Sequence, residues 1–478
     1  MTEPSQGARI DGHDNVIVQA SGGSRVDVTL GATLALEPPP DPTALPPATS
    51  EYHLLQASAA VTEFVGRDYV LGQLREWLMH PDAFSIQVVT GGAGSGKTRL
   101  AHELLRGVPP GWQAGQIQPG RLRSVPDHQL PRAWRWDKPT LVAIDYASEC
   151  GPALAAWIAA LAPAASAERP MRILLLERGA SEETGWFADV RGLWSRMSIP
   201  AFRSVLPPAL PSPLGSLHEE AHRTALFAAA RRAARALHKT SGPDPLADAQ
   251  LEAWVRESTW REPLSLMMAG VLSASAEGGS LLRMNPRELA TEIARRERER
   301  ILRDPRVDKN QSAGELALQM AVRVTLAGGL PTQDLRQALQ ATAGALELTD
   351  AAAQSDARTV LLNKLPGEPG ALSPLRPDIP AEAFVLTELF GENSFGPDAA
   401  AAALEVAWSR NRAAAISFWI RMASRLQRSR SRRGSTQSPG IGSPGSPVPS
   451  RRAGAGGEPI GALPCAAGQH SRAQRLHE

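Results

Sequence analysis

Apolar runs of strand length alternate with helical patterns in the first half of the chain. Buried-strand patterns occur at residues 84–90, 140–144 and 172–176. A glycine-rich turn and a helical segment that runs through Leu105 follow the first of them, and an alanine-rich helical stretch, 153–161, separates the other two. Strands that alternate with helices are typical of a parallel sheet covered by helices. We therefore predict an α/β domain with a parallel sheet.

The second half of the chain has an almost continuous helical pattern. A proline-rich stretch, 206–215, separates it from the first half. The predicted helices cover residues 219–237, 248–257, 263–274, 285–302, 313–326 and 332–341. The fourth starts with the pattern of a capping box, in which Asn285 and Glu288 would each accept a hydrogen bond from the backbone of the other. These patterns predict an all-helical module.

Both ends of the chain differ in composition from the middle. Alternating polar and apolar positions on either side of a Ser-Gly-Gly-Ser turn predict a β-hairpin over residues 15–30. The proline-dense stretch 37–47 is interpreted as a semi-rigid spacer. After Leu426 the chain turns to Arg, Ser, Pro and Gly, a composition that predicts disorder and that a reading-frame slip would also produce. The predicted organisation is an N-terminal β-hairpin segment (1–35), a proline-rich linker (36–58), an α/β domain (59–215), a helical lid or regulatory module (216–425) and a disordered tail (426–478).

Composition and charge narrow the function classes. The 478 residues are 42% hydrophobic and 21% charged, which suits a soluble protein of two or three domains. Before Arg428 there are 43 Lys+Arg against 47 Asp+Glu, so the predicted folded part lacks the basic excess of a nucleic-acid-binding protein. Two distant cysteines, Cys150 and Cys465, provide neither a disulfide framework nor a cysteine zinc site. With no signal-peptide or membrane-spanning pattern, we expect a cytoplasmic protein.

The strongest chemical signal is Gly91-Gly-Ala-Gly-Ser-Gly-Lys-Thr98, which matches G-x4-G-K-[ST] between a predicted strand and a predicted helix. Backbone N–H groups of such a loop surround a phosphate at a helix N-terminus, where the helix dipole favours an anion. Lys97 would reach the β- and γ-phosphates, and the Thr98 hydroxyl would bind Mg²⁺. A glycine-rich turn with only a structural role is the alternative. The residues predicted to bind a nucleotide here are Gly91, Gly92, Gly94, Ser95, Gly96, Lys97 and Thr98, which makes residues 59–215 a predicted α/β P-loop NTPase domain.

Three residues near strand ends are candidates for catalysis. Asp145 follows the strand 140–144, where a Walker B carboxylate would hold Mg²⁺ at the carboxyl end of a neighbouring strand, although an ordinary acid at a strand end is the alternative. Glu149 is the nearest acid that could orient the attacking water. Arg178, after the third strand, could contact a γ-phosphate with its planar fork of donors or form a surface ion pair, and Glu177 could be its structural partner.

Several motifs around these residues resemble those of the STAND class of P-loop ATPases, signal-transducing switches related to the AAA+ group, and in particular its bacterial ATP-binding members. Phe64-Val-Gly-Arg-Asp68 is similar to the segment that precedes the P-loop in this class, and Asp145-Tyr-Ala147 is similar to its Walker B motif. Residues 172–178 resemble the sensor strand of this class, and Glu262-Pro-Leu264 is similar to its G-x-P-L element. Residues 374–378 resemble a PL-x-PD segment found in bacterial members. The resemblance covers roughly residues 60 to 425.

The resemblance implies a molecular switch that binds ATP and Mg²⁺ between the two domains and couples slow hydrolysis to its open, closed or oligomeric state. It implies that Arg67 and Pro263 contact the nucleotide. The alternative for Arg67 is an ion pair on the surface, and the alternative for Pro263 is a proline that only begins a helix. Ser148 stands where related sequences usually have an acid, which argues for slow turnover. The implied ligands are ATP and ADP. The implied protein partner is either another protein or a second copy of this chain, bound through the N-terminal segment and the helical module. The implied role is in bacterial signalling or defence. We expect no membrane and no nucleic-acid partner.

Three other functions would use the same P-loop. An AAA+ ATPase of the origin-recognition or DNA-remodelling type would need a basic DNA-binding module, and a small-molecule kinase would need a lid and an acceptor site; neither is evident in the sequence. A hydrolysis-deficient scaffold would bind Mg²⁺ and ATP without turnover. The loop itself does not select ATP over GTP, because it contacts the phosphates and not the base.

Overall fold

A computed structural model of the chain describes residues 34–44, 48–125, 134–196, 212–240, 244, 246–275, 278–281, 283–348, 350–365, 370–391 and 394, with scattered positions from 400 to 419. All of them fall within one compact unit, residues 1–425. The predicted hairpin over residues 15–30 and the predicted tail from 426 onward lie outside the described residues.

Five parallel strands form the sheet of the α/β domain, in the order β2-β3-β4-β1-β5. They are β1 (Phe84–Thr90), β2 (Gln113–Gln116), β3 (Thr140–Asp145), β4 (Met171–Glu177) and β5 (Ser212–Pro213). The three central strands are almost entirely buried, as expected for a parallel sheet covered on both faces. The predicted α/β fold with a parallel sheet is confirmed, and its three apolar runs are β1, β3 and β4.

The two remaining strands have no apolar pattern, and the sequence does not predict them. β2 is Gln-Ala-Gly-Gln, and the second residue of β5 is a proline, Pro213. Both lie at edges of the sheet, where a strand pairs with one neighbour in the sheet and tolerates proline and polar residues. β5 belongs to the proline-rich stretch 206–215, which the sequence analysis interprets as a boundary.

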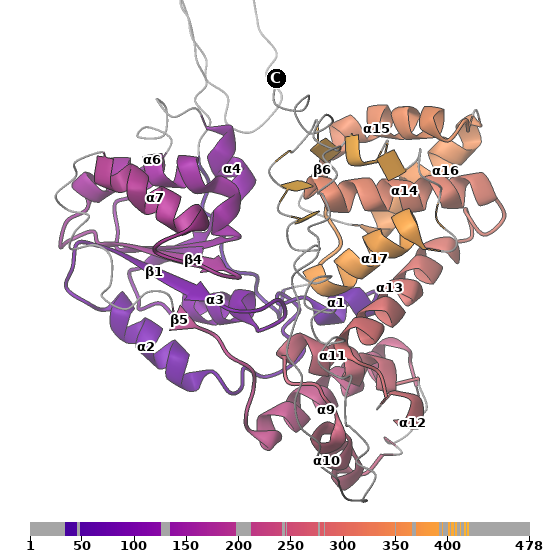
Figure 1. The fold of residues 1–478 in the computed structure, drawn as a ribbon, viewed down its shortest axis with the longest axis horizontal. Coiled ribbons are helices and arrows are strands. Elements are labelled where there is room, and N and C mark those ends of the chain that lie inside the picture. Colours follow the sequence, from indigo (N-terminus) through magenta and orange to yellow (C-terminus); the bar gives the residue numbers. More distant parts are fainter. Residues whose placement is uncertain are drawn as a thin grey trace, which may run out of the picture. The chain divides into compact units, whose positions relative to one another are not determined.

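Helices cover both faces of the sheet (Figure 1). The helical segments of this domain are α2 (Asp68–Leu78), α3 (Lys97–Arg106), α4 (Pro119–Ser124), η2 (Ala147–Cys150), α6 (Gly151–Leu161), η3 (Ala162–Ala164) and α7 (Gly185–Arg196). In β1, Val88 belongs to the core shared with α6 and α7, and the next residue, Val89, belongs to the core shared with α2 and α3. Side chains that alternate between two buried faces explain why the central strands are continuous apolar runs.

The second half of the described chain is a helical module. Its helices are α9 (Glu220–Leu237), α10 (Asp248–Glu257), α11 (Pro263–Ser273), α12 (Gly278–Leu281), α13 (Pro286–Leu302), α14 (Gln311–Ala327), α15 (Thr332–Ala345), α16 (Ala351–Lys364) and α17 (Asp378–Phe390). All six predicted helices are present, and the capping box of Asn285 and Glu288 forms. The module is not entirely helical, because β6 (Leu330–Pro331) and β7 (Ala371–Leu372) form an antiparallel pair. None of the described helices is long and apolar enough to cross a membrane.

The segment expected to be a linker, 36–58, is attached to both parts of the structure. Glu37 and Gln116 of β2 form an antiparallel bridge with N···O distances of 2.9 and 2.7 Å. Within the same segment, α1 (Glu51–Leu55) packs into the core of the helical module, and the Glu51 carboxylate forms an ion pair with α13. The linker therefore contains a helix and contacts the sheet as well as the helical module.

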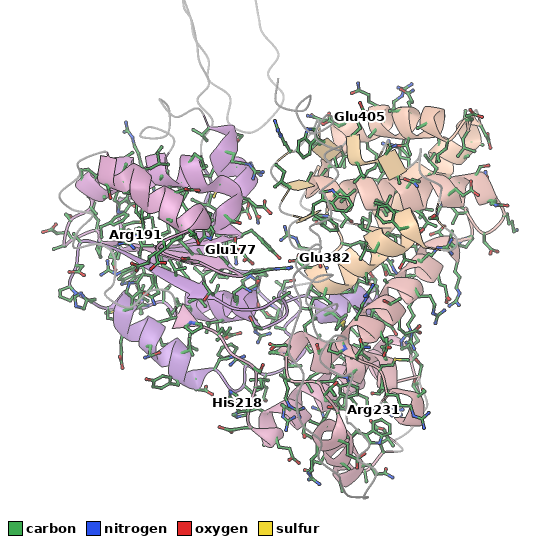
Figure 2. The ribbon with its side chains drawn as sticks, viewed as in Figure 1. Glu177, Arg191, His218, Arg231, Glu382 and Glu405 are labelled. Atoms are coloured by element: carbon green, nitrogen blue, oxygen red, sulfur yellow. The ribbon has the colours of Figure 1, made fainter. Side chains whose placement is uncertain are left out.

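α9 and α11 approach each other closely at Gly270. A Cβ atom at this position would lie 2.9 Å from the Ala230 Cβ and would also meet the Phe227 carbonyl oxygen. Beside this contact, Arg231 of α9, which is labelled in Figure 2, pairs with Asp244 through Nε and Nη2 at 2.8 and 3.0 Å. The two helices can pack this tightly only because residue 270 has no side chain.

We expect Gly270→Ala to lower the free energy of unfolding by roughly 1–3 kcal/mol, because one helix must shift to accept the methyl group. Gly344→Ala is the control: this position is exposed in α15 and has no atom near an added Cβ. Helix propensity predicts a gain of up to about 1 kcal/mol there. Chemical denaturation measures both changes, and equal effects of the two substitutions would show that the α9–α11 contact is not tight.

Candidate functional site

The predicted P-loop lies between β1 and α3, and its backbone requires glycine. Gly94 and Gly96 have φ angles of +77° and +95°, a region that residues with a side chain rarely adopt. A Cβ atom on Gly91 would lie 2.7 Å from the Ser95 hydroxyl oxygen. Gly96 directly precedes the first turn of α3. The loop is therefore a tight turn that leads the chain into a helix N-terminus.

The groups around this turn fit an anion. The first N–H groups of α3 have no partner within the helix, and the helix dipole adds positive potential there. The Lys97 ammonium donates to the carbonyl oxygens of Gly91 and Gly92 at 2.8 and 3.1 Å. Burial lowers the pKa of Lys97, and the Asp145 carboxylate opposes this change. Ser95 is 1% exposed, and its hydroxyl has no hydrogen-bond partner in the described part of the chain. A phosphate group would satisfy these donors.

The two predicted metal ligands, Thr98 and Asp145, lie side by side. The Thr98 hydroxyl donates to Asp145 Oδ2 at 2.7 Å, and Asp145 Oδ1 accepts the Tyr146 N–H at 3.0 Å. Burial raises the pKa of the Asp145 carboxyl, while the Thr98 hydrogen bond and the Lys97 charge oppose this change. The sequence analysis expects Asp145 at the end of a strand adjacent to β1, which precedes the P-loop. In the structure β4 lies between β1 and β3, so the strand that ends at Asp145 is not adjacent to β1.

This hydroxyl–carboxylate pair suits a cation that arrives with a nucleotide. Mg²⁺ prefers oxygen ligands, and in nucleotide sites one or two protein groups hold it together with phosphate oxygens and water. No group of three or more His, Cys, Asp or Glu side chains that could hold a metal occurs among the described residues. Thr98 and Asp145 fit an Mg²⁺ ion that is also bound to phosphate oxygens.

Arg178 and Glu177, at the end of β4, have different surroundings. The Glu177 carboxylate accepts hydrogen bonds from the backbone N–H groups of Ser148 at 3.1 Å and Arg178 at 2.7 Å. Nη2 of the Arg178 guanidinium donates to Asp378 Oδ2 at 2.9 Å and Glu382 Oε1 at 3.0 Å. Both acids belong to α17, about two hundred residues later in the chain. The candidate sensor arginine is thus in contact with the helical module.

Glu149, the candidate for orienting water, lies beside Arg123 of α4. The Arg123 Nη1 donates to the Glu149 carbonyl oxygen at 2.7 Å and lies 3.6 Å from its carboxylate. Glu149 lines the same cavity as the P-loop. Its role in orienting water stays a prediction.

Arg67 and Pro263, the other two predicted nucleotide contacts, both lie against the P-loop. Arg67 Nη2 donates to the Ser95 carbonyl oxygen at 3.3 Å. Pro263 is the first residue of α11, and the backbone N–H of the following residue, Leu264, donates to the Gly94 carbonyl oxygen at 3.1 Å. The helical module therefore contacts the P-loop directly through the start of α11.

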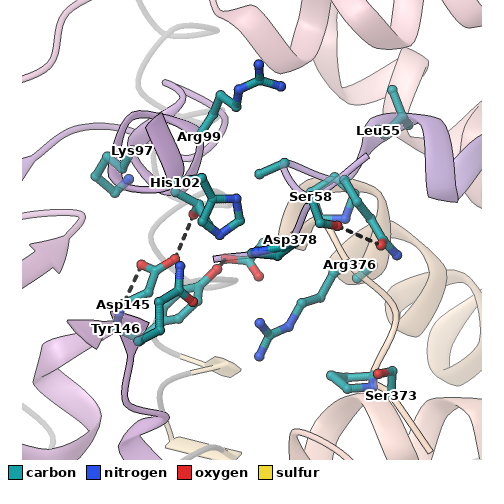
Figure 3. A pocket seen from close by; sticks show the side chains of 18 of the residues that line it. Leu55, Ser58, Lys97, Arg99, His102, Asp145, Tyr146, Ser373, Arg376 and Asp378 are labelled. Atoms are coloured by element: carbon teal, nitrogen blue, oxygen red, sulfur yellow. Dashed lines mark hydrogen bonds between the residues drawn. The ribbon is translucent and has the colours of Figure 1, made fainter. Parts of the chain in front are cut away.

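Three residues of the site that lie inside the Asp-Tyr-Ala and PL-x-PD motifs are absent from the sequence-based candidates: Tyr146, Arg376 and Asp378. Tyr146 has a φ angle of +57°, and its hydroxyl donates to Asp378 Oδ2 at 2.6 Å. Arg376 is exposed and lines the cavity, where its side chain extends from the loop before α17 (Figure 3). Tyr146 belongs to the Asp-Tyr-Ala motif, and Arg376 and Asp378 belong to the PL-x-PD motif. Treating every polar residue of these two motifs as a candidate would have identified all three.

A cavity of about 1160 Å³ connects these groups. Its lining includes the P-loop, Asp145, Arg178, the start of α11 and the loop before α17. Figure 3 shows Lys97, Asp145 and Arg376 among the residues that line it. Small-molecule pockets commonly measure about 300–1,000 Å³, so this cavity has room for a nucleotide. The parallel sheet, the P-loop and the helical module together confirm the predicted fold class.

No model of a known protein family matches the chain, and no curated protein matches its sequence. Among solved structures, the chain is similar to the Aeropyrum pernix ORC1 protein in complex with DNA, with 13% identity and a TM-score of 0.33 over 71% of this chain and 97% of that one. It is also similar to PH0952 from Pyrococcus horikoshii, a STAND protein with a tetratricopeptide repeat sensor, with 13% identity and a TM-score of 0.31 over 73% of this chain and 48% of that one. A single-substitution variant of RuvB from Thermotoga maritima has 16% identity and a TM-score of 0.28 over 67% and 95% of the two chains. Because these scores are low, the fold assignment rests on the strands, the loop and the helices described above.

His102 in α3 provides a pH test of this part of the structure. Burial lowers the pKa of its imidazole from 6.5 to about 4. Between these values the unfolded chain takes up a proton that the folded protein does not, so the free energy of unfolding falls as the pH decreases, by up to roughly 3 kcal/mol. We expect His102→Gln to flatten this dependence in urea denaturation, and His218→Gln, at an exposed position, is the matched control. The same slope in His102→Gln and wild type would contradict the burial argument.

Proposed function

We propose that the protein is an ATP-binding molecular switch of the STAND type that acts in bacterial signalling or defence. Mg²⁺ and ATP would bind at the P-loop, and slow hydrolysis would reset the open, closed or oligomeric state. The observation that carries this proposal is the 2.7 Å hydrogen bond between Thr98 and Asp145 beside the P-loop lysine. It unites the hydroxyl and the carboxylate that hold nucleotide-bound Mg²⁺ in P-loop NTPases.

Each group of the P-loop site has a role in this proposal. The loop N–H groups and Lys97 would bind the phosphates, and Thr98 and Asp145 would hold Mg²⁺. The ion would supply neutralisation of the charge on the phosphates. Arg178 would contact the γ-phosphate with its planar fork of donors. These roles place the negative charge of the nucleotide against the cations and the helix N-terminus.

The helical module contacts the site at two places, which couples its position to the nucleotide. The start of α11 donates to the Gly94 carbonyl oxygen, and α17 holds Arg178. Pro263 at the start of α11 and Arg67 before α2 would contact the nucleotide beside the loop. A nucleotide that changes the free energy of either contact changes the balance of open and closed states.

Two features favour slow turnover. Tyr146, Ala147 and Ser148 follow Asp145, so no acid stands directly beside the candidate metal ligand. Glu149, the nearest acid, interacts with Arg123, and a general base must reach the attacking water to be effective. The same features support a second candidate function, a scaffold that binds Mg²⁺ and ATP without hydrolysing ATP.

We expect Lys97→Ala to weaken the binding of ATP with Mg²⁺ at least about tenfold, since a charge-assisted contact is worth roughly 1.5–3 kcal/mol. Asp145→Asn should retain nucleotide binding but lose most of the dependence on Mg²⁺ and the turnover. Lys309→Ala and Asp308→Asn, at exposed positions of the helical module, are the matched controls. Titration with a fluorescent ATP analogue, phosphate release and light scattering with and without nucleotide measure binding, turnover and assembly.

The same measurements separate the alternatives. A wild-type protein that binds no nucleotide would refute the proposal, and saturable binding without phosphate release would favour the scaffold. An AAA+ ATPase of the origin-recognition or DNA-remodelling type predicts affinity for double-stranded DNA that falls steeply with salt. Fluorescence anisotropy with labelled DNA at two salt concentrations tests that alternative.

A further inference from the structure

Two acids of α17 hold the guanidinium of Arg178. Arg178 Nη2 lies 2.9 Å from Asp378 Oδ2 and 3.0 Å from Glu382 Oε1. The two acids are four residues apart in a helix, so they lie on one face. The Glu382 side chain is 1% exposed, and those of Asp378 and Arg178 are 19% and 21% exposed. Salt screens such partly buried pairs less than it screens pairs on the surface.

Tyr146 makes a third contact with this acidic pair. Its hydroxyl donates to Asp378 Oδ2 at 2.6 Å. Tyr146 directly follows Asp145 at the end of β3, and Arg178 directly follows β4. α17 is therefore attached to the ends of the two strands that carry the candidate metal ligand and the candidate phosphate sensor.

Asp378 also lies within electrostatic reach of the proposed phosphate site. Burial lowers the pKa of Lys97 and raises the pKa of Asp145. The Asp378 charge has a smaller effect, which raises the pKa of both groups. A γ-phosphate bound here would repel Asp378. Phosphate and carboxylate bind a guanidinium through the same donors, so they would compete for Arg178.

We propose that Asp378 and Glu382 are internal competitors of the γ-phosphate for Arg178, so that α17 makes the site discriminate ATP from ADP. ADP leaves the ion pairs intact, because it has no third phosphate for Arg178 to contact. ATP engages the Nη2 donor of Arg178 only when this donor leaves the two acids, and the free energy of breaking these contacts reduces the affinity for ATP. Release of α17 is then the structural signal of a bound triphosphate. This inference rests on the proposed function of the same site.

Asp378→Asn tests the competition, because it removes the charge and nearly preserves the size of the side chain. We expect the affinity for a non-hydrolysable ATP analogue with Mg²⁺ to rise about tenfold, a typical coupling between linked sites, with little change in the affinity for ADP. Tyr146→Phe removes the hydroxyl that shares Asp378 Oδ2 with Arg178 and leaves both ion pairs of Arg178 in place, so it should not raise the ratio of the two affinities. Isothermal titration calorimetry with both nucleotides measures this ratio.

Glu388→Gln is the matched control for a general loosening of α17. Glu388 lies on the same helix and pairs with Arg298 of α13 at 3.0 Å. We expect this variant to keep the wild-type ratio of ATP to ADP affinity. A rise as large as that of Asp378→Asn would show that any loosening of α17 has this effect, and it would overturn the specific role of Asp378.

Hydrogen–deuterium exchange of wild type provides a second readout. We expect the ATP analogue, and not ADP, to increase the exchange of backbone amides in α17. If both nucleotides bind and neither the exchange of α17 nor the affinity ratio in Asp378→Asn changes, the inference is overturned while the proposed function stands. If the wild type binds neither nucleotide, the proposed function fails, and the inference fails with it.

Discussion

The hydrogen bond between Thr98 and Asp145 fixes the P-loop helix against the sheet, and the rest of the site is arranged around it. It depends on a loop tight enough to start α3 beside the strand ends, which requires the positive φ angles of Gly94 and Gly96. It also depends on the turn after β3, where Tyr146 adopts a left-handed conformation and donates its N–H to the second Asp145 oxygen. A carboxylate in a largely buried place must be hydrogen-bonded to remain charged, so these local features support one another.

The charges around this hydrogen bond come from both parts of the structure. The α/β domain supplies Lys97 and Arg178 with their acidic neighbours, whereas the helical module supplies Arg376 and two carboxylates on α17. Neither part alone contains the whole set. A nucleotide that binds here would therefore enter an existing arrangement of charges, and a γ-phosphate at Arg178 would be repelled by the Asp378 carboxylate that already contacts this arginine. This gives a physical reason for the module to respond to the number of phosphates.

The N-terminal part of the described chain links the two halves beside the cavity. It pairs with β2 at Glu37, packs α1 into the helical core and then places Arg67 against the P-loop. Residues on both sides of α1 line the cavity. The segment is therefore held at the sheet and at the helical module. The linker is thus part of the site as well as a connection.

The sequence alone determined the local features of this protein: the three central strands, the helical stretches that became α3 and α6, six helices of the helical module, the capping box at Asn285 and the P-loop. Each of these depends on residues close together in the chain, so periodicity and glycine spacing reveal it. Only the tertiary structure decided the strand order, the docking of α1, the approach of α11 to the loop and the partners of Arg178. Some of these contacts join residues two hundred or more positions apart, as for Arg178 and Asp378 or for Glu51 and Arg296. Local pattern carries no information on which distant acid meets a given arginine, because packing of the whole fold selects that pair.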